Sequence, residues 1–182
     1  RRGHPDRSST DRVWVVDPLD GTREFAEPPR TDWAVHVALA EAGHPTAGAV
    51  ALPGVGLTLS TAEPPNSSAL PPIPTRPRIV VSRTRPAIEA MAVADALGAD
   101  LVEMGSAGAK AMAVVRGEAD AYVHTGGQHE WDSCAPVAVA LATGLHATRV
   151  DGSPLDYNQA DPYLPDLVVC RMELAGRILA AL

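Results

Sequence analysis

The chain has 182 residues, of which 46% are hydrophobic and 20% are charged, and its net charge is −7. This composition is ordinary for one globular domain or two small ones, and the acidic balance excludes general binding to nucleic-acid polymers, which requires a basic surface. The sequence has no apolar run long enough to cross a membrane and no signal-peptide pattern. Two cysteines are too few for a disulfide framework, so we expect a cytoplasmic protein.

The polar opening at residues 1–10 predicts no regular element, and the first predicted strand is residues 12–16. Its β-branched apolar run indicates a strand buried on both faces. The strand runs into Asp17, after which Pro18 cannot donate a ladder hydrogen bond and the chain turns sharply past Asp20. The two carboxylates therefore reach one rim of the sheet, where they repel each other unless a cation lies between them. Such a turn suits Mg²⁺; the alternative is a β-turn whose aspartates cap their own backbone.

Residues 23–25 predict a short helical turn, and three strands follow at residues 33–39, 46–52 and 56–61. Glycine and proline supply the turns between these strands, which favours an antiparallel meander. His36 lies in the first of the three strands. It fits a core or sheet-face position better than a ligand role, because no partner stands at metal-ligand spacing from it.

Residues 62–77 contain six prolines and cannot bury a core, so they predict a loop or a linker between domains. We place a domain boundary in this segment. Residues 1–75 would form an α+β domain with the antiparallel sheet and the metal site, and residues 76–182 an α/β domain.

Strands and helices alternate in the second half, which indicates a sheet with helices on its faces. The predicted strands are residues 78–82, 101–104, 121–124, 146–150 and 167–170. The predicted helices are residues 86–97, 105–116, 133–143 and 171–182. Glycines at the ends of two of these helices are typical C-terminal caps.

Two strings carry a resemblance to a known family: WVVDPLDGTREF at residues 14–25 and EWDSCAP at residues 130–136. They resemble the two signatures of the inositol monophosphatase superfamily of metal-dependent, lithium-sensitive phosphatases, in the family's order. The stretches SRTRP, GSAGAKAMAV and GSPLDYNQADPYLPDL are similar to the 3′(2′),5′-bisphosphate nucleotidase (CysQ) group within it. The resemblance implies a layered α-β-α-β-α sandwich. Family members begin with a helical pair and an acidic segment, and because no such acidic string precedes Asp17, we expect the N-terminal helical segment to be missing here.

The resemblance also implies a set of metal ligands. Asp17, the carbonyl of Leu19, Asp20 and Asp132 would hold two or more Mg²⁺ ions, and Asp17 would bridge them. Judged without the resemblance, Asp132 is a plain N-cap in front of the predicted helix at residues 133–143. Its meeting with the other two aspartates is a tertiary contact that no spacing demonstrates.

Substrate contacts follow from the same resemblance. Gly21 and Thr22 would offer backbone N–H groups to the phosphate. Thr22 and Asp17 would be the catalytic residues, Thr22 by orienting the attacking water through its hydroxyl and Asp17 by bridging the metal ions. Residues 105–110 place small residues and Lys110 at a predicted helix start, which is either an anion site or a packing face with a solvated lysine.

Four residues are candidates to hold the second phosphate and the ribose of a nucleotide substrate: Arg85, Ser106, Lys110 and Tyr157. Arg85 is alternatively a surface charge, and Tyr157 a packed loop aromatic.

The function we predict is a Mg²⁺-dependent hydrolase that removes the 3′-phosphate of adenosine 3′,5′-bisphosphate and yields AMP and phosphate. Its partner would be a small phosphorylated substrate, with no nucleic-acid polymer and no membrane, and a homodimer is left open. The first alternative is an inositol monophosphatase or fructose-1,6-bisphosphatase activity. The second is a non-catalytic module that binds a phosphate or nucleotide, should the acidic segment be truly absent.

Overall fold

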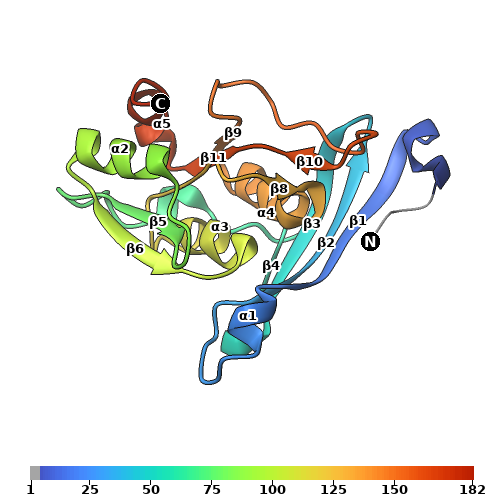
Figure 1. Cartoon of the computed structure of the whole chain (residues 1–182), viewed down its shortest axis with the longest axis horizontal. Helices are drawn as coiled ribbons and strands as arrows, with labels where there is room; N and C mark the ends of the chain where they lie inside the picture. The colour runs from blue at the N-terminus through green and yellow to red at the C-terminus, as the bar shows by residue number, and fades with distance from the viewer. Residues whose placement is uncertain (1–4) are drawn as a thin grey trace.

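In a computed structural model, which describes residues 5–182, the chain forms two β-sheets with helices between them and on one outer side (Figure 1). Helices α3 (Ala107–Val115) and α4 (Glu130–Thr143) fill the space between the sheets. Helices α2 (Ile88–Leu97) and α5 (Met172–Leu179) cover the far face of the second sheet. This β-α-β-α order of the described layers agrees with the predicted layered sandwich.

The first sheet is the predicted antiparallel meander, in the order β1-β2-β3-β4. Its strands are β1 (Arg12–Asp20), β2 (Ala34–Glu41), β3 (His44–Leu52) and β4 (Leu57–Ser60). The pairing of β1 with β2 shifts register between Asp17 and Asp20, where Pro18 has no N–H to donate. The strand therefore continues through both aspartates, further than predicted. The predicted helical turn follows as α1 (Thr22–Phe25).

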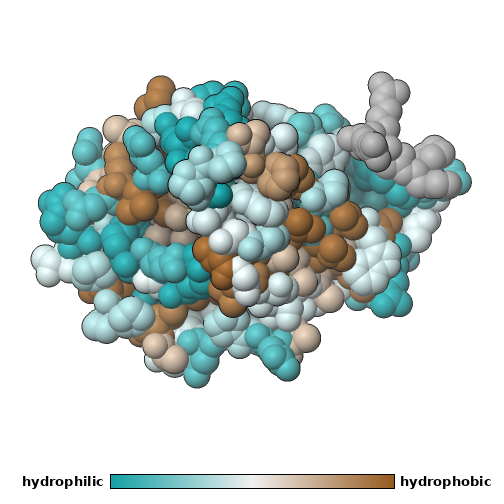
Figure 2. Space-filling view, turned by 90° about the horizontal axis from the view of Figure 1, so that it is seen from below, coloured by the Kyte–Doolittle hydropathy of each residue, from teal (hydrophilic) through white to brown (hydrophobic). Residues whose placement is uncertain are grey.

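The prediction that the first strand is buried on both faces is wrong. β1 is an edge strand, and only the face toward α4 is covered. On that face Val13 and Val15 pack against the core. On the other face Trp14 is 68% exposed and Val16 is 49% exposed. A strand covered on both faces and a strand with one exposed apolar face can have the same run of apolar residues, so the sequence alone did not distinguish them. Figure 2, which views the whole molecule from below, shows further hydrophobic patches between hydrophilic side chains.

The second sheet is mixed, in the order β6-β5-β7-β11-β9. Its strands are β5 (Arg78–Ser82), β6 (Asp100–Met104), β7 (Ala121–His124), β9 (His146–Thr148) and β11 (Leu167–Cys170). β5 runs parallel to β6 and β7, whereas β11 is antiparallel to β7 and β9. A further ladder of two residues per strand, β8 (Gln128–His129) with β10 (Tyr163–Leu164), was not predicted because it is too short for a periodic pattern.

All four predicted helices of the second half begin at other residues than predicted, and α3 and α5 start two residues and one residue late, at Ala107 and Met172. α2 starts at Ile88, two residues after Pro86, and α4 starts at Glu130, three residues before the predicted start. Asp132 is therefore not the residue before the helix but part of its first turn. With the predicted start at residue 133, Pro136 would lie in the first turn; with the observed start it lies in the second turn.

Alternate residues of the central strands enter two separate cores. Val80 and Tyr122 face the helices between the sheets, and Ile79 packs on the outer side against α2 and α5. The inner core also contains Val50 of the first sheet, so it combines residues from both predicted domains, 1–75 and 76–182. The division into those domains stays a prediction.

The remaining segments agree with their polar and proline-rich sequences. Residues 62–77 are irregular except for the 3₁₀ helix Ser67–Ala69, which confirms a loop there, while its role as a linker between domains stays a prediction. No regular element was predicted for residues 1–10. The first four lie outside the described part, and the 3₁₀ helix Pro5–Ser9 corrects the prediction for the rest. Pro53–Val55 forms another 3₁₀ turn. None of the helices in the described part of the chain has the length and apolarity needed to span a bilayer.

Gly48 allows β3 to approach α4 closely, since a Cβ there would lie 2.9 Å from the Cβ of Ala138 and 3.1 Å from the Ala135 carbonyl oxygen. We predict that Gly48→Ala lowers the free energy of unfolding by about 1–3 kcal/mol, because overpacking forces the helix away from the sheet. Gly176→Ala is the matched control. Nothing lies within 4 Å of its Cβ position in α5, so it should be neutral or stabilising by up to about 1 kcal/mol. Urea unfolding measures both, and equal losses would contradict the prediction.

Candidate active site

The structure brings the three predicted aspartates together. Asp17 and Asp20 come from the end of β1, and Asp132 comes from the first turn of α4. One carboxylate oxygen of each lies within 4.8 Å of the others. Asp17 and Asp20 are each 8% exposed, and Asp132 is half-buried. The tertiary contact on which the sequence interpretation depends is therefore present.

Burial and the charges of neighbouring carboxylates perturb Asp17 and Asp132. The pKa of Asp17 is raised mainly by burial and also by the charge of Asp20, while the N–H of Leu19, 3.1 Å from Oδ1, opposes the shift. The pKa of Asp132 is raised to about 6, first by burial and then by the charges of Asp20 and Asp17. The N–H of His129 donates to Asp132 Oδ2 at 2.7 Å and opposes this shift. A positive ion among the carboxylates would remove their repulsion, and aspartate oxygens are the hard donors that Mg²⁺ prefers.

Asp20 is held by the start of α3. Its Oδ2 accepts hydrogen bonds from the Ser106 hydroxyl and from the N–H of Gly108, the latter at 2.7 Å. N–H groups in a first helical turn have no partner inside the helix, and the helix dipole favours a negative charge there. Asp20 thus joins the end of β1 to α3 through one carboxylate oxygen.

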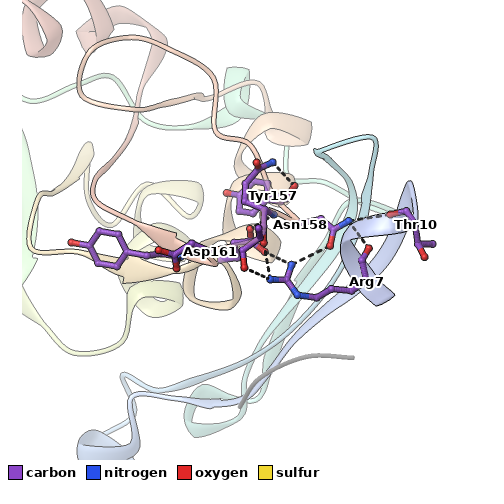
Figure 3. A network of polar contacts seen from close by, with 9 residues as sticks. Arg7, Thr10, Tyr157, Asn158 and Asp161 are labelled. Carbon is purple, nitrogen blue, oxygen red and sulfur yellow. Dashed lines mark hydrogen bonds and ion pairs between the residues drawn. The ribbon is translucent and has the colours of Figure 1, made fainter. Parts of the chain in front are cut away.

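A polar network fixes the place where α4 begins (Figure 3). Glu130, the first residue of α4, accepts a hydrogen bond from the N–H of Gln159 at 2.7 Å, and its Oε2 lies 4.0 Å from Arg7 Nη1. Arg7 also donates to Asn158 Oδ1 at 3.2 Å and to the Gln159 carbonyl at 2.6 Å. Asn158 in turn donates to the carbonyl of Thr10 at 3.0 Å. The first turn of α4, which carries the third aspartate, is therefore anchored to two distant loops.

A polar pocket of about 210 Å³ adjoins the acidic cluster. Ser106 connects the pocket with the cluster, because it lines the pocket and its hydroxyl donates a hydrogen bond to Asp20. The lining residues come from α1, from the loop after β5 and from the start of α3: Thr22, Arg23, Glu24, Ser82, Arg83, Thr84, Arg85, Gly105, Ser106 and Lys110. Four of the residues predicted to contact substrate are among them.

Lys110 lies at the inner end of this pocket. It is 5% exposed, its Nζ donates to the carbonyl of Ser106 at 2.8 Å, and Nζ lies 5.2 Å from the centroid of the Tyr122 ring. Burial lowers the pKa of Lys110, and the nearby carboxylates, led by Asp20, oppose that effect. The side chain of Ser106 caps α3 by accepting the N–H of Ala109 at 3.0 Å.

The arginines of the pocket differ in their pairing. Arg83 is neutralised by Glu24 and Glu27, each 2.9 Å away. Arg23 and Arg85 form no ion pair with a carboxylate in residues 5–182, so their charges face the pocket unpaired. The sequence interpretation named Arg85 but missed Arg23 and the buried Glu24. The signal available was their position directly after the DPLDGT string.

The turn residues take the conformations that the pattern predicts. Gly21 has φ of 82°, and a Cβ there would lie 3.0 Å from the Cβ of Ser106, so both its backbone and its contact need glycine. The Thr22 hydroxyl lies 3.4 Å from the carbonyl of Leu19. Tyr157 is the exception among the predicted substrate residues. It is fully buried, its hydroxyl lies 3.2 Å from Ser133 Oγ, and it does not line the pocket.

A carboxylate cluster suited to divalent cations, beside a cationic pocket on a layered α/β fold, is the arrangement of a metal-dependent phosphatase. The chain belongs to the inositol monophosphatase family, whose model matches residues 2–182. The resemblance found in the sequence is thereby confirmed.

Individual relatives agree with this family. The chain is 53% identical over 182 residues to the 3′-phosphoadenosine 5′-phosphate phosphatase of Mycobacterium tuberculosis, and the match covers 97% of this chain and 68% of that protein. It is 32% identical over 166 residues to the 3′(2′),5′-bisphosphate nucleotidase CysQ of Escherichia coli, with 87% and 67% covered. The crystal structure of CysQ from Bacteroides thetaiotaomicron matches with a TM-score of 0.73 at 24% identity, covering 93% of this chain and 74% of that one. At this identity the structural match shows the fold alone.

The raised pKa of Asp132 predicts how the cation-free protein responds to pH. The pKa of Asp132 is about 6 in the folded chain and 3.8 ordinarily. The protonated carboxyl therefore contributes its full stability to the fold below pH 3.8, and this contribution is lost as the pH rises through about 6. We therefore predict that, in a chelator at pH 7.5, Asp132→Asn raises the free energy of unfolding by on the order of 2 kcal/mol. The gain should vanish at pH 4.

Thermal unfolding at the two pH values measures this difference. Added Mg²⁺ should stabilise the unaltered chain and leave the variant unchanged, which reverses their order. An Asp132→Asn variant that is less stable in chelator at pH 7.5 would contradict the electrostatic description of the cluster.

Proposed function

We propose that this chain carries the active site of a Mg²⁺-dependent 3′(2′),5′-bisphosphate nucleotidase, which releases the 3′-phosphate of adenosine 3′,5′-bisphosphate and leaves AMP. The observation that carries this proposal is the three-aspartate cluster directly beside a pocket with three cationic side chains that no carboxylate pairs within residues 5–182: Arg23, Arg85 and Lys110. The printed names of the relatives at 53% and 32% identity support the same substrate class.

Asp17, Asp20, Asp132 and the Leu19 carbonyl would hold two or more Mg²⁺ ions. Their donor atoms are all oxygen, and the raised pKa of Asp17 and of Asp132, caused by burial and by the neighbouring carboxylates, supports this assignment because a bound cation would relieve that repulsion. When bound, such ions supply an activated water and neutralise charge that develops on the leaving oxygen.

The turn after β1 would position the phosphate that is removed. Gly21 and Thr22 present backbone N–H groups at the start of α1, next to Asp17 and Asp20, and can bind phosphate oxygens. The Thr22 hydroxyl is exposed beside the Leu19 carbonyl and would orient the attacking water. These groups keep the phosphorus in line between the attacking and leaving oxygens, which is the geometric part of the rate enhancement.

The cationic pocket would bind the second phosphate of the substrate. Lys110 and Arg85 were assigned this role from the sequence, and the pocket adds Arg23. Ser106 would act mainly by holding Asp20, because its hydroxyl already donates there. A substrate contact for Tyr157 stays a prediction that its buried position does not support.

Two alternatives remain distinguishable by assay. An inositol or fructose bisphosphate phosphatase would turn over inositol 1-phosphate or fructose 1,6-bisphosphate at least as well as adenosine 3′,5′-bisphosphate, and comparable rates would overturn the nucleotidase proposal. A non-catalytic module would bind the nucleotide without Mg²⁺-dependent release of phosphate. A homodimer and a cytoplasmic location stay predictions.

Asp17→Asn tests the metal assignment. We predict a loss of turnover of more than about 100-fold, because the change removes one ligand charge and almost no volume. Asp11→Asn is the matched control, since Asp11 is exposed just before β1 and outside the cluster, and it should leave turnover unchanged. Phosphate release with adenosine 3′,5′-bisphosphate measures both, and an Asp17→Asn variant of near-native rate would refute the assignment.

Lys110→Met tests the second-phosphate pocket while it preserves the volume of the side chain. We predict that KM for adenosine 3′,5′-bisphosphate rises by about 10-fold or more, while KM for 3′-AMP, which has one phosphate, changes by less than about 2-fold. Arg177→Met removes the same charge from the exposed side of α5 and should affect neither substrate. Equal changes in KM for the two substrates would count against the pocket.

A further inference from the structure

His36 lies beside Asp17 and Asp20 and contacts the helix that carries Asp132. It lies in β2 directly opposite Asp17 in the strand pairing, and its Nε2 lies 3.4 Å from Asp20 Oδ2. Its Nδ1 lies 3.0 Å from the carbonyl oxygen of Trp131, the residue that precedes Asp132 in α4. The sequence interpretation as a core histidine is confirmed, because the residue is 0% exposed. The contacts with the cluster were not foreseen.

The ring fills the space between three elements. A Cβ at Gly108, in the first turn of α3, would lie 2.0 Å from His36 Nε2, so the ring has no room to move in that direction. Within residues 5–182, Nε2 has no other polar partner than Asp20, at a distance longer than a good hydrogen bond. Any shift of β1, α3 or α4 would therefore move the ring or collide with it.

From this geometry we infer that His36 is a positioning residue, which holds the aspartates at the mutual distances that cation binding requires. The inference rests on the proposed function, since it concerns the same site. His36 is not a catalytic residue, because it is buried behind the carboxylates and lines no part of the pocket. Groups behind a metal ligand commonly set its orientation, and their loss weakens metal affinity by about 10–100-fold.

A histidine suits this position because its two nitrogens face acceptors on opposite sides of one rigid ring. The contact of Nδ1 with Trp131 and the contact of Nε2 with Asp20 can be removed separately. In His36→Asn the amide nitrogen replaces Nδ1 and keeps the bond to Trp131, whereas in His36→Gln the amide group replaces Nε2 and keeps the contact with Asp20. His36→Leu fills the space and makes neither contact.

The experiment follows thermal unfolding of the full chain as Mg²⁺ is added after chelator treatment, so its readout does not depend on turnover. We expect His36→Leu to raise by about 10-fold the Mg²⁺ concentration needed for a given rise in melting temperature, with smaller increases for His36→Asn and His36→Gln. Gly108→Ala places a methyl group against the His36 ring and should raise the required Mg²⁺ concentration as well. Val50→Ala is the matched control: it removes buried volume from the residue paired with His36 in β3 and should lower stability without that shift.

Equal Mg²⁺ dependence of His36→Leu and Val50→Ala would overturn the inference. Should His36→Leu not fold, the same comparison with His36→Asn and His36→Gln decides it. A chain that responds to Mg²⁺ while these variants match Val50→Ala leaves the proposed function standing and refutes the role of His36 alone. An unaltered chain that shows no response to Mg²⁺ at all overturns both.

Discussion

Three carboxylates held within 4.8 Å of one another form the constraint on which the rest of this structure depends. Burial and like charge raise the pKa of Asp17 and of Asp132, so keeping the cluster ionised opposes folding. Each aspartate is supported by a main-chain donor, from Leu19, Gly108 and His129 respectively. Donors of this kind stabilise the charged carboxylates but do not remove the cost of their burial or their mutual repulsion. A bound divalent cation would complete the balance, which is why we interpret the cluster as a metal site.

The layers of the fold deliver these groups from segments far apart in the chain. β1 carries two aspartates to its end on the edge of the first sheet, and α4, packed between the sheets, carries the third in its first turn. α3 starts at the same place and supplies both a donor to Asp20 and Lys110 to the neighbouring pocket. Because the anionic cluster and the cationic pocket share the start of α3, the proposed substrate with two phosphates would engage both regions at once.

The departures from the sequence interpretation have physical causes. β1 was expected to be buried on both faces because its residues form a continuous apolar run. Whether each face is buried depends on which elements pack against it, and in the described part of the chain only α4 does so. α4 begins earlier than expected because the β8–β10 ladder and Glu130 fix its first turn through partners on another loop. Arg23 was overlooked because a charged residue after a turn is ordinary in sequence, and only its position at the pocket distinguishes it.

What the amino-acid sequence determined by itself was local. Pro18 cannot donate a ladder hydrogen bond and Gly21 tolerates a positive φ at no steric cost, so the turn that presents Asp17 and Asp20 was predictable from those residues. The alternation of strands and helices, and the oxygen chemistry of the site, were predictable in the same way. Only the tertiary structure decided that Asp132 reaches the turn, that His36 joins β1 to α4, and that Tyr157 stays in the core. Contacts of this kind depend on how α4 packs between the two sheets, and no pattern among neighbouring residues encodes that distance.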